Sequence, residues 1–488
     1  MKRKLKNLLL IPMILMITLS SSMVASATNL PYDTYNFDYW NYVVMTPAAY
    51  VPDTNISGLK LGIGSFVNPQ DLYVAEDGFV YVADTGNNRI VVLNADMSSV
   101  VKVIDTFDNN GTADTFKAPS GVYVSGKNQI YIADTENFRV VVLNADGTLV
   151  KIISNPTSEV LDKGFVFNPL KVSVDYADRV YVIAKNMFQG VMAFDELGNF
   201  TGFSGTISVN ISPAEKFWRR FSTKAQRQKQ VLFIPTEFTG IDVDPEGFLY
   251  ATSIDNTGTQ AVRRLNPKGE DVIKKGEKKK VGGDIDFSMR GTYGGASYIS
   301  DVVVREKGIY SMIDTRRGRI FTYDHEGNLL YIFGGLGSQA GTFRIPVAIE
   351  AIGDKILVLD SSRAEILTFV ETKYGSLIND AVGLRFDGDE KLAVEKWEQV
   401  LKLNANFELA NIGIGKAYLT AGDNKNAMKY LKLGMSKDYY SIAFKRYRNE
   451  ILKDNLGYIL TGVIVLVVGV NVFSRIRKHK SGRRNEDD

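Results

Sequence analysis

Short strand-like patterns of alternating apolar and polar residues recur along the middle of the chain at an even spacing. The stretch YVADTGNNRIVVLNAD begins at Tyr81, YIADTENFRVVVLNAD begins at Tyr131, and Tyr181 keeps the same 50-residue step. The apolar runs are separated by turns rich in Gly, Asn and Asp, which is typical of antiparallel strands. Six such units are recognisable, beginning near Asn68, Ala118, Asn168, Pro235, Ala296 and Phe343.

Each unit contains four predicted strands, as QDLYV, FVYVADT, RIVVLNAD and SVVKVI show for the first unit. One small twisted sheet cannot bury both of its apolar faces, whereas a ring of such sheets can. Periods of about 40–50 residues with four strands each indicate a β-propeller. The sequence therefore predicts a mainly β fold with a six-bladed propeller over residues 55–372. We expect the ring to close by pairing of Asn41–Met45 with Glu365–Glu371.

The pattern changes from strands to helices at Tyr374. The segments DGDEKLAVEKWEQVLKLNANF and AGDNKNAMKYLKLGMSKDY align with a step of 34 residues, which is the period of tetratricopeptide repeats. Residues 373–454 therefore resemble a small helical domain of that type. Stacked helix pairs form either a peptide-binding groove or a rigid stalk, and both alternatives stay open here.

Both ends of the chain carry segments typical of membrane targeting. Residues 1–27 combine basic residues, an apolar run and a small-residue motif at Ala25–Ala27, which predicts a cleaved signal peptide. Residues 456–473 are uncharged and apolar over about 27 Å of helix, enough to cross a bilayer core. Because the basic residues 474–488 favour the cytoplasmic side, we expect a single-pass protein of the cell membrane with extracytoplasmic N-terminal domains and a cytoplasmic tail.

Composition narrows the chemistry that the chain can perform. The net charge is only +3, which is no footprint for nucleic acid, and cysteine is absent, which excludes disulfides and thiolate sites. The chain has two histidines, His325 and His479, and the second lies in the predicted tail. A histidine-ligated zinc site in the propeller is therefore excluded. The sequence shows no nucleophile triad, phosphate loop or nucleotide fingerprint.

An aspartate and an arginine recur in the turns between the second and third strands of the units. A catalytic site needs its groups once, at one point, whereas a set repeated around a ring is typical of a turn. In such a turn the carboxylate accepts backbone N–H groups and the guanidinium pairs with it or with a neighbour. We interpret these residues as structural: Asp84, Arg89, Asp134, Arg139, Asp314, Arg319, Asp360 and Arg363.

The repeat breaks in the third, fourth and fifth units, where polar residues replace the usual ones at the loop ends. If the loops at one end of the ring form a pocket, these residues give it a partly basic mouth suited to an anionic or polyhydroxy ligand. The candidate binding residues are Lys185, Asn186, Asp255, Asn256, Arg316 and Arg317.

Two further segments are candidates for docking. Residues 212–231 predict a helix inserted in the propeller, with a serine cap and a proline in its first turn. It is either a docking helix for an acidic partner, a wall polymer or lipid headgroups, or a solvated helix covering the sheet. Its basic and aromatic face comprises Lys216, Phe217, Arg220, Phe221, Lys224 and Arg227. Within the N-terminal segment 28–54, the aromatic stretch YDTYNFDYWNY predicts either stacking on sugar rings or packing onto the blades.

The first two units, NPQDLYVAEDGFVYVADTGNNRIVVLNAD and APSGVYVSGKNQIYIADTENFRVVVLNAD, resemble NHL repeats, the repeat of a class of six-bladed propellers. The resemblance extends more loosely over roughly residues 55–372. It implies the fold but no single function, because proteins with this repeat include protein-binding and RNA-binding scaffolds and lyases. Related gluconolactonase-like propellers hydrolyse sugar lactones with a divalent cation.

These observations together predict a membrane-anchored extracytoplasmic binding scaffold, an accessory subunit of a membrane or envelope complex. The expected partners are membrane or envelope proteins, for example a polytopic transporter component, with a carbohydrate as a candidate ligand and no nucleic acid. No cofactor, catalytic residue or metal ligand is predicted, although composition leaves a divalent cation such as calcium open. The alternative is a metal-dependent hydrolase of sugar lactones, and the sequence favours binding over catalysis without deciding between them.

Overall fold

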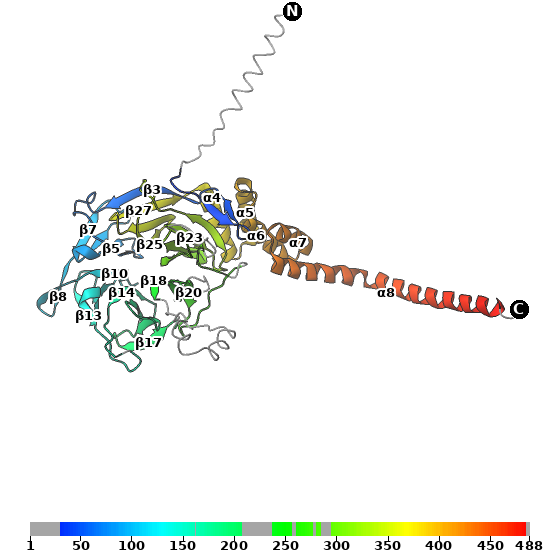
Figure 1. Ribbon diagram of the computed structural model, residues 1–488, viewed down its shortest axis with the longest axis horizontal. Helices are drawn as coiled ribbons and strands as arrows, with labels where there is room; N and C mark the ends of the chain where they lie inside the picture. The colour runs from blue at the N-terminus through cyan, green and yellow to red at the C-terminus, as the bar shows by residue number, and fades with distance from the viewer. Residues whose placement is uncertain are drawn as a thin grey trace, which may run out of the picture.

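The computed structural model describes residues 30–161, 163–206, 237–255, 260–276, 280–284 and 294–484, with side chains as far as Lys478. It shows a ring of small sheets, then a group of helices, then one long helix that extends away from both (Figure 1). The predicted signal peptide, the predicted docking helix and Asn256 lie outside the described residues.

Six sheets form the ring, and in each sheet the strands follow one another in chain order from the channel outward, except that the outer strand of the sixth sheet comes from the start of the chain. Among the described residues, five sheets have four strands and the fourth has three. The predicted six-bladed propeller is therefore confirmed. The first strands, which contact one another around the channel, are β4 (Asp71–Val74), β10 (Pro119–Val124), β14 (Pro169–Val174), β18 (Phe238–Val243), β21 (Ile299–Val304) and β25 (Pro346–Ile352).

The remaining strands of each blade lie progressively further from the channel. The second strands are β5 (Val80–Asp84), β11 (Ile130–Asp134), β15 (Val180–Ala184), β19 (Leu249–Ser253), β22 (Tyr310–Asp314) and β26 (Lys355–Asp360). The third strands are β6 (Arg89–Leu93), β12 (Arg139–Leu143), β16 (Val191–Phe194), β20 (Val262–Leu265), β23 (Arg319–Tyr323) and β27 (Glu365–Glu371). The fourth strands are β7 (Val100–Ile104), β13 (Leu149–Ile153), β17 (Phe200–Ser204), β24 (Leu329–Phe333) and β3 (Tyr50–Ser57), and β8 (Thr106–Asn109) and β9 (Thr112–Thr115) form a hairpin between the first two blades.

A strand from the start of the chain closes the ring, but it is not the expected one. β3 pairs antiparallel with β27, so that Tyr50 lies opposite Glu371 and Ile56 opposite Ile366. The expected strand instead supplies β2 (Val43–Met45), which pairs with β1 (Tyr35–Phe37) in a separate hairpin. The predicted pairing of Asn41–Met45 with β27 is therefore wrong. The physical reason is burial, because Tyr50 and Ile56 enter the cores beside the last blade while the ends of β2 are exposed.

The apolar core lies between neighbouring blades. Side chains that follow one another along a strand point to opposite faces of the sheet, and in the first blade they enter two different cores. Ile90 packs with Ile132 of the second blade, whereas Val91 packs with Leu357 of the sixth blade. The strands can therefore be apolar at nearly every position, because both faces of each sheet are covered.

Five helices follow the propeller among the described residues: α4 (Lys373–Phe386), α5 (Glu390–Leu403), α6 (Glu408–Thr420), α7 (Asn424–Leu433) and α8 (Lys437–Arg484). The turns before α5 and α7 repeat at the predicted 34-residue step. Gly388 and Gly422 have positive φ values, and Asp389 and Asp423 cap the helices that follow. The helical region is confirmed, and its assignment to the tetratricopeptide type stays a prediction.

A partly buried ion network joins these helices to the fifth blade. Glu326, in the turn between β23 and β24, accepts a hydrogen bond from Lys416 of α6 at 2.6 Å and lies 3.6 Å from Arg385 of α4. Burial by itself raises the pKa of Glu326, but the two neighbouring cations outweigh burial and lower that pKa to about 2. The network therefore fixes the helices on the propeller most firmly when Glu326 is ionised.

We expect Glu326→Gln to lower the melting temperature at neutral pH and to have little effect near pH 2. A carboxyl with a depressed folded-state pKa stabilises the fold above its unfolded pKa, and that stability is lost as the pH falls through the folded pKa. From a usual value of 4.5 to about 2, the contribution at pH 7 is at most roughly 3 kcal/mol, because one pKa unit corresponds to about 1.4 kcal/mol. Thermal unfolding in detergent between pH 2 and 8 measures it, with the exposed Glu395→Gln as control. A difference from wild type that is independent of pH would contradict this assignment.

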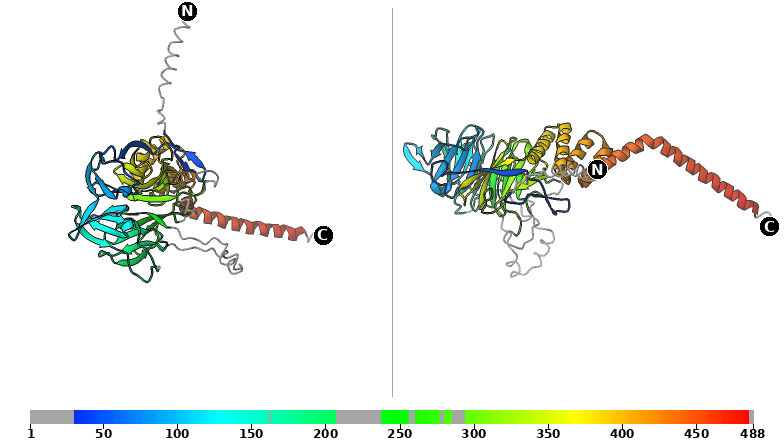
Figure 2. Two further views of the ribbon diagram at one scale, coloured as in Figure 1. Left: turned by 60° about the vertical axis from the view of Figure 1, so that its left-hand side comes forward. Right: turned by 90° about the horizontal axis from the view of Figure 1, so that it is seen from above.

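The long helix α8 leaves the helical region and points away from the propeller (Figures 1 and 2). Its stretch Lys437–Lys478 contains an apolar window with a mean hydropathy of 2.3, none of it buried. One helix is therefore long and apolar enough to cross a membrane, which is consistent with a single-pass anchor. Which end faces the cytoplasm stays a prediction.

Candidate functional site

The repeated aspartates of the first two blades lie in the turns between the second and third strands. Asp84 accepts hydrogen bonds from the backbone N–H of Val67 at 2.7 Å, from Asn87 at 2.8 Å and from the Arg89 guanidinium at 2.7 Å. Asp134 has the same three kinds of partner at 2.7–2.9 Å. Each carboxylate therefore ties the turn to the chain that enters its blade.

The fifth and sixth blades keep the aspartate but use the arginine differently. Asp314 and Asp360 accept backbone N–H groups near the start of their own blades. The guanidinium groups of Arg319 and Arg363 donate to backbone carbonyls of nearby loops instead of to these aspartates. The four turns thus share the buried acceptor, while the arginine binds whichever acceptors its loop presents.

Replacing Asp134 with alanine is expected to destabilise the protein by about 2–4 kcal/mol. The carboxylate is fully buried, and its loss leaves Arg139 and a backbone N–H without their acceptor. Chemical unfolding of the full chain measures the change. Asp146→Ala, at an exposed turn of the same blade, should cost less than about 1 kcal/mol. Equal effects of the two substitutions would contradict a structural role for the repeated turn.

The residues proposed for a pocket mouth lie in neighbouring turns, where they form hydrogen bonds with nearby loop residues. The backbone N–H of Asn186 donates to Glu237 at 2.6 Å, and Asp255 accepts the backbone N–H of Gln260 at 2.7 Å. Arg316 and the buried Arg317 donate to backbone carbonyls of residues 294–296. These contacts build loops, and a ligand-binding role for these residues and for Lys185 stays a prediction.

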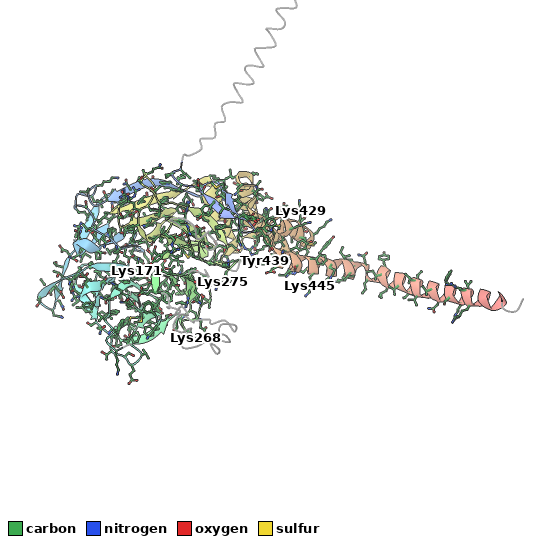
Figure 3. The ribbon with its side chains drawn as sticks, in the orientation of Figure 1. Lys171, Lys268, Lys275, Lys429, Tyr439 and Lys445 are labelled. Carbon is green, nitrogen blue, oxygen red and sulfur yellow. The ribbon has the colours of Figure 1, made fainter. Side chains whose placement is uncertain are left out.

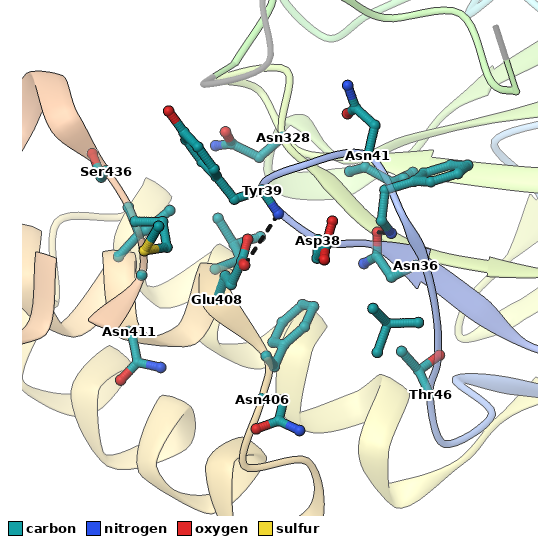
Figure 4. Close-up of a pocket in the computed structure, with 18 of the residues that line it drawn as sticks. Asn36, Asp38, Tyr39, Asn41, Thr46, Asn328, Asn406, Glu408, Asn411 and Ser436 are labelled. Atoms are coloured by element: carbon teal, nitrogen blue, oxygen red, sulfur yellow. Dashed lines mark hydrogen bonds between the residues drawn. The ribbon is translucent and has the colours of Figure 1, made fainter. Parts of the chain in front are cut away.

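A cleft of about 1180 Å³ lies where the β1–β2 hairpin, the fifth blade and the helices meet. Figure 4 shows Tyr39 and Asn41 of the hairpin on one side and Glu408 and Asn411 of α6 on the other. The backbone N–H of Tyr39 donates to the Glu408 carboxylate at 3.1 Å, which joins the two sides. Six asparagines from all three parts line the cleft: Asn36, Asn41, Asn328, Asn404, Asn406 and Asn411.

The hairpin divides the N-terminal aromatic stretch into two parts with different surroundings. Tyr35 packs into the fifth blade, where its hydroxyl donates to the buried Asp284. Trp40 and Tyr42, at the tip, are 61% and 70% exposed beside the cleft. The first part of the stretch therefore packs onto the blades. The second part presents exposed aromatic rings, and stacking of these rings on sugars stays a prediction.

The lining of the cleft combines amide and aromatic side chains with charges of both signs, from Asp38, Glu408 and Asp438 and from Lys280 and Lys437. Each amide side chain offers a donor and an acceptor, and the rings of Phe37, Tyr39 and Phe407 supply flat apolar surface. Peptide backbones and sugars both carry groups that match such a lining. The sequence indicated the aromatic part alone, because the asparagines come from three separate segments of the chain, between Asn36 and Asn411.

A second group of charged side chains lies in the channel of the propeller. Lys171 of β14, which Figure 3 labels inside the ring, donates a hydrogen bond to Asp71 of β4 and lies 3.4 Å from a carboxylate oxygen of Asp301 of β21. All three residues are buried. Each carboxylate also accepts a backbone N–H from the next blade, from Val122 at 2.9 Å and from Ile349 at 3.1 Å. This Lys171 triad therefore ties together the first strands of several blades.

The electrostatics of the Lys171 triad reflect its burial. Burial raises the pKa of Asp301 to about 6 even though Lys171 lowers it. Burial also disfavours the charged form of Lys171, but the two carboxylates outweigh that effect and hold its pKa above the usual value. Among the described residues, no group of three or more His, Cys, Asp or Glu side chains is arranged to hold a metal ion.

The first two blades also identify the repeat. The family described as "NHL repeat" matches residues 66–93 and 116–143, which contain β4–β6 and β10–β12. The chain contains NHL repeats. No curated protein matches the sequence.

Solved structures similar to this NHL propeller belong to differently described proteins. A virginiamycin B lyase from Staphylococcus aureus is 11% identical, with a TM-score of 0.39, and the match covers 65% of this chain and 99% of the lyase. A protein of unknown function from Bacteroides thetaiotaomicron is 14% identical, with a TM-score of 0.41 and coverages of 70% and 76%. A putative gluconolactonase is 12% identical, with a TM-score of 0.39 and coverages of 67% and 94%. All three TM-scores lie below 0.5, so these likenesses carry no argument about function.

Proposed function

We propose that this protein is a membrane-anchored extracytoplasmic scaffold that binds another membrane or envelope protein, as an accessory subunit of a membrane complex. The observation that supports this most directly is the unbroken connection from the NHL propeller to the apolar helix. The propeller is tied to α4 and α6 through Glu326, and α8 follows α7 after a short turn. A surface carried on such a support is held at a fixed height above the bilayer.

The cleft and the exposed hairpin beside it are the binding surface that we assign to this role. Aromatic side chains are enriched at protein interfaces because they bury a large area with few rotatable bonds. Trp40, Tyr42 and Met45 supply such area, and the cleft supplies amide groups around it. The proposed partner is a polytopic membrane protein, for example a transporter component, and a carbohydrate is the alternative ligand for the cleft.

The test is co-purification of the full-length chain from detergent extracts of the native membrane, with a partner identified by mass spectrometry. We expect the double variant Trp40→Ala/Tyr42→Ala to lose the partner while remaining folded. The matched control is Tyr176→Ala, which removes an aromatic residue that is 69% exposed on a different turn of the propeller. Retention of the partner by the double variant, or its loss from both variants, would overturn this assignment of the binding surface.

The lactone-hydrolase alternative makes a different prediction for the same preparation. It requires calcium-dependent hydrolysis of sugar lactones that chelation abolishes. The scaffold proposal expects no such hydrolysis. Hydrolysis lost with a chelator and restored with calcium would replace the scaffold with the enzyme.

A further inference from the structure

A second row of side chains faces the channel, one step along the first strands from the Lys171 triad. The triad row holds Asp71, Gly121, Lys171, Gly240, Asp301 and Ala348, one from each blade. Residues two apart on a strand share a face, so the side chains two residues later lie on the same side of the first strands as the triad row. They are Tyr73, Tyr123, Ser173, Asp242, Val303 and Glu350.

This second row contains two carboxylates without a cation. Asp242 accepts the backbone N–H of Val304 at 2.6 Å, and among the described residues neither Asp242 nor Glu350 forms an ion pair. Burial raises the pKa of Asp242 to about 7 and raises the pKa of Glu350 well above its usual value, and the other channel carboxylates add to both shifts. Both residues are nevertheless partly exposed, so solvent reaches them.

The other walls of this row are aromatic, with one buried hydroxyl. The rings of Tyr73 and Tyr123 lie with their centroids 4.6 Å apart, and the Tyr123 hydroxyl donates to a backbone carbonyl of β14 at 2.9 Å. Ser173 is 0% exposed, and its hydroxyl has no hydrogen-bond partner among the described residues. A buried hydroxyl without a partner costs free energy unless a ligand supplies one.

The Lys171 triad shows what such a row can hold. There, an alkylammonium group of the chain itself lies between two carboxylates from different blades, Asp71 and Asp301. We propose that the second row is a binding site for an alkylammonium group supplied by a ligand. Asp242, Glu350 and the Ser173 hydroxyl accept its N–H groups, and the two tyrosine rings pack against its alkyl stem and positive charge.

The residues present favour an ammonium group over a metal ion. Calcium takes six to eight oxygen ligands, several of them carboxylates, whereas this row offers two carboxylates and one hydroxyl beside aromatic rings. An ammonium group needs only about three acceptors, and aromatic faces attract it. The Lys171 triad lies two residues away along the same first strands and forms one boundary of this site.

The test is calorimetric titration of the full-length protein in detergent with n-butylammonium chloride. We expect saturable binding to one site in the wild type and at least tenfold weaker binding in Glu350→Gln. Ser173→Ala should bind several-fold more weakly, and Asp146→Asn, at an exposed turn outside the channel, should bind as the wild type does. Glu350→Gln replaces a carboxyl that forms no ion pair among the described residues with an amide of the same shape, so we expect it to fold, and circular dichroism checks this.

Two further arms identify the source of the ammonium group. A short peptide with one internal lysine tests whether the ammonium group comes from a partner's side chain, and cadaverine tests whether it comes from a free diamine. Preferential binding of either compound supports the site and identifies the source of the ammonium group. No saturable binding of any amine, or equal affinity in wild type and Glu350→Gln, overturns it. Saturable calcium binding that the amines do not displace also overturns it. This proposed site is separate from the scaffold role. The outcome of the amine titration does not depend on the outcome of the co-purification test with the hairpin variants.

Discussion

Replacing Lys171 with methionine is expected to destabilise the propeller by about 3–5 kcal/mol. The substitution leaves Asp71 and Asp301 buried in the channel without their cation. Asp242 and Glu350, two residues along the same strands, are carboxyls as well and supply no cation in place of the lysine. Chemical unfolding of the full chain in detergent measures the loss.

Two companion variants show whether charge or packing causes this loss. The triple variant Lys171→Met/Asp71→Asn/Asp301→Asn removes the stranded charges, so it should recover much of the stability. Lys127→Met breaks an exposed ion pair with Asp178 and should cost less than about 1 kcal/mol. If the single and triple variants are equally unstable, Lys171 does not stabilise the propeller through its ion pairs.

The loss in Lys171→Met should also depend on pH. A buried carboxyl whose folded-state pKa is raised binds its proton more tightly in the folded state than in the unfolded chain. The stability of the variant therefore rises as the pH falls through the raised pKa, which for Asp301 is already about 6 with the lysine in place. We expect the difference from wild type to be smaller at pH 5 than at pH 8.

Deleting residues 30–57 is expected to abolish the cooperative unfolding transition of the propeller. The deletion removes β3, whose Tyr50 and Ile56 fill the cores beside the last blade. It also leaves β27 as an open edge with unpaired backbone groups. Calorimetry and near-ultraviolet circular dichroism of the truncated chain measure the effect.

The matched control deletes only residues 30–45, which contain the β1–β2 hairpin. It removes the buried Tyr35 but keeps β3, so we expect a lower melting temperature with a cooperative transition retained. A cooperative transition in the longer deletion would mean that the ring closes without its N-terminal strand. The two deletions together separate closure of the ring from packing of the hairpin.

The blades were predictable from the sequence because their apolar strands are buried on both faces and recur at a fixed step. The closing strand was not predictable, because its sequence YVPDTNIS contains Pro, Asp, Asn and Ser and therefore resembles a loop. Only Tyr50 and Ile56 of its eight residues are buried. Its outer position in the blade also tolerates Pro52, which an inner strand would not. The neighbouring VVM has the more strand-like composition, but its first and last residues face solvent.

The channel residues escaped prediction for a different reason. A repeat is recognised by what its units share, and the positions equivalent to Asp71, Lys171 and Asp301 hold glycine or alanine in the other three blades. Lys171 meets its partners 100 and 130 residues away in the chain, so no local spacing indicates the pair. Glycine at two of these positions is informative afterwards, because a Cβ on Gly240 would lie 2.5 Å from the Cα atom of Asp301.

The closing strand has a consequence for how the protein is made. Asn55 of β3 hydrogen-bonds Glu365 of β27, which lies 310 residues later in the chain. At synthesis rates of about 5–20 residues per second, the first strand waits roughly 15–60 s for its partner to emerge. During that interval β3 has no sheet to join and the growing arc of blades has two open edges. Ring closure is therefore a late event in biogenesis, and the nascent chain is most exposed to misassembly just before the sixth blade is complete.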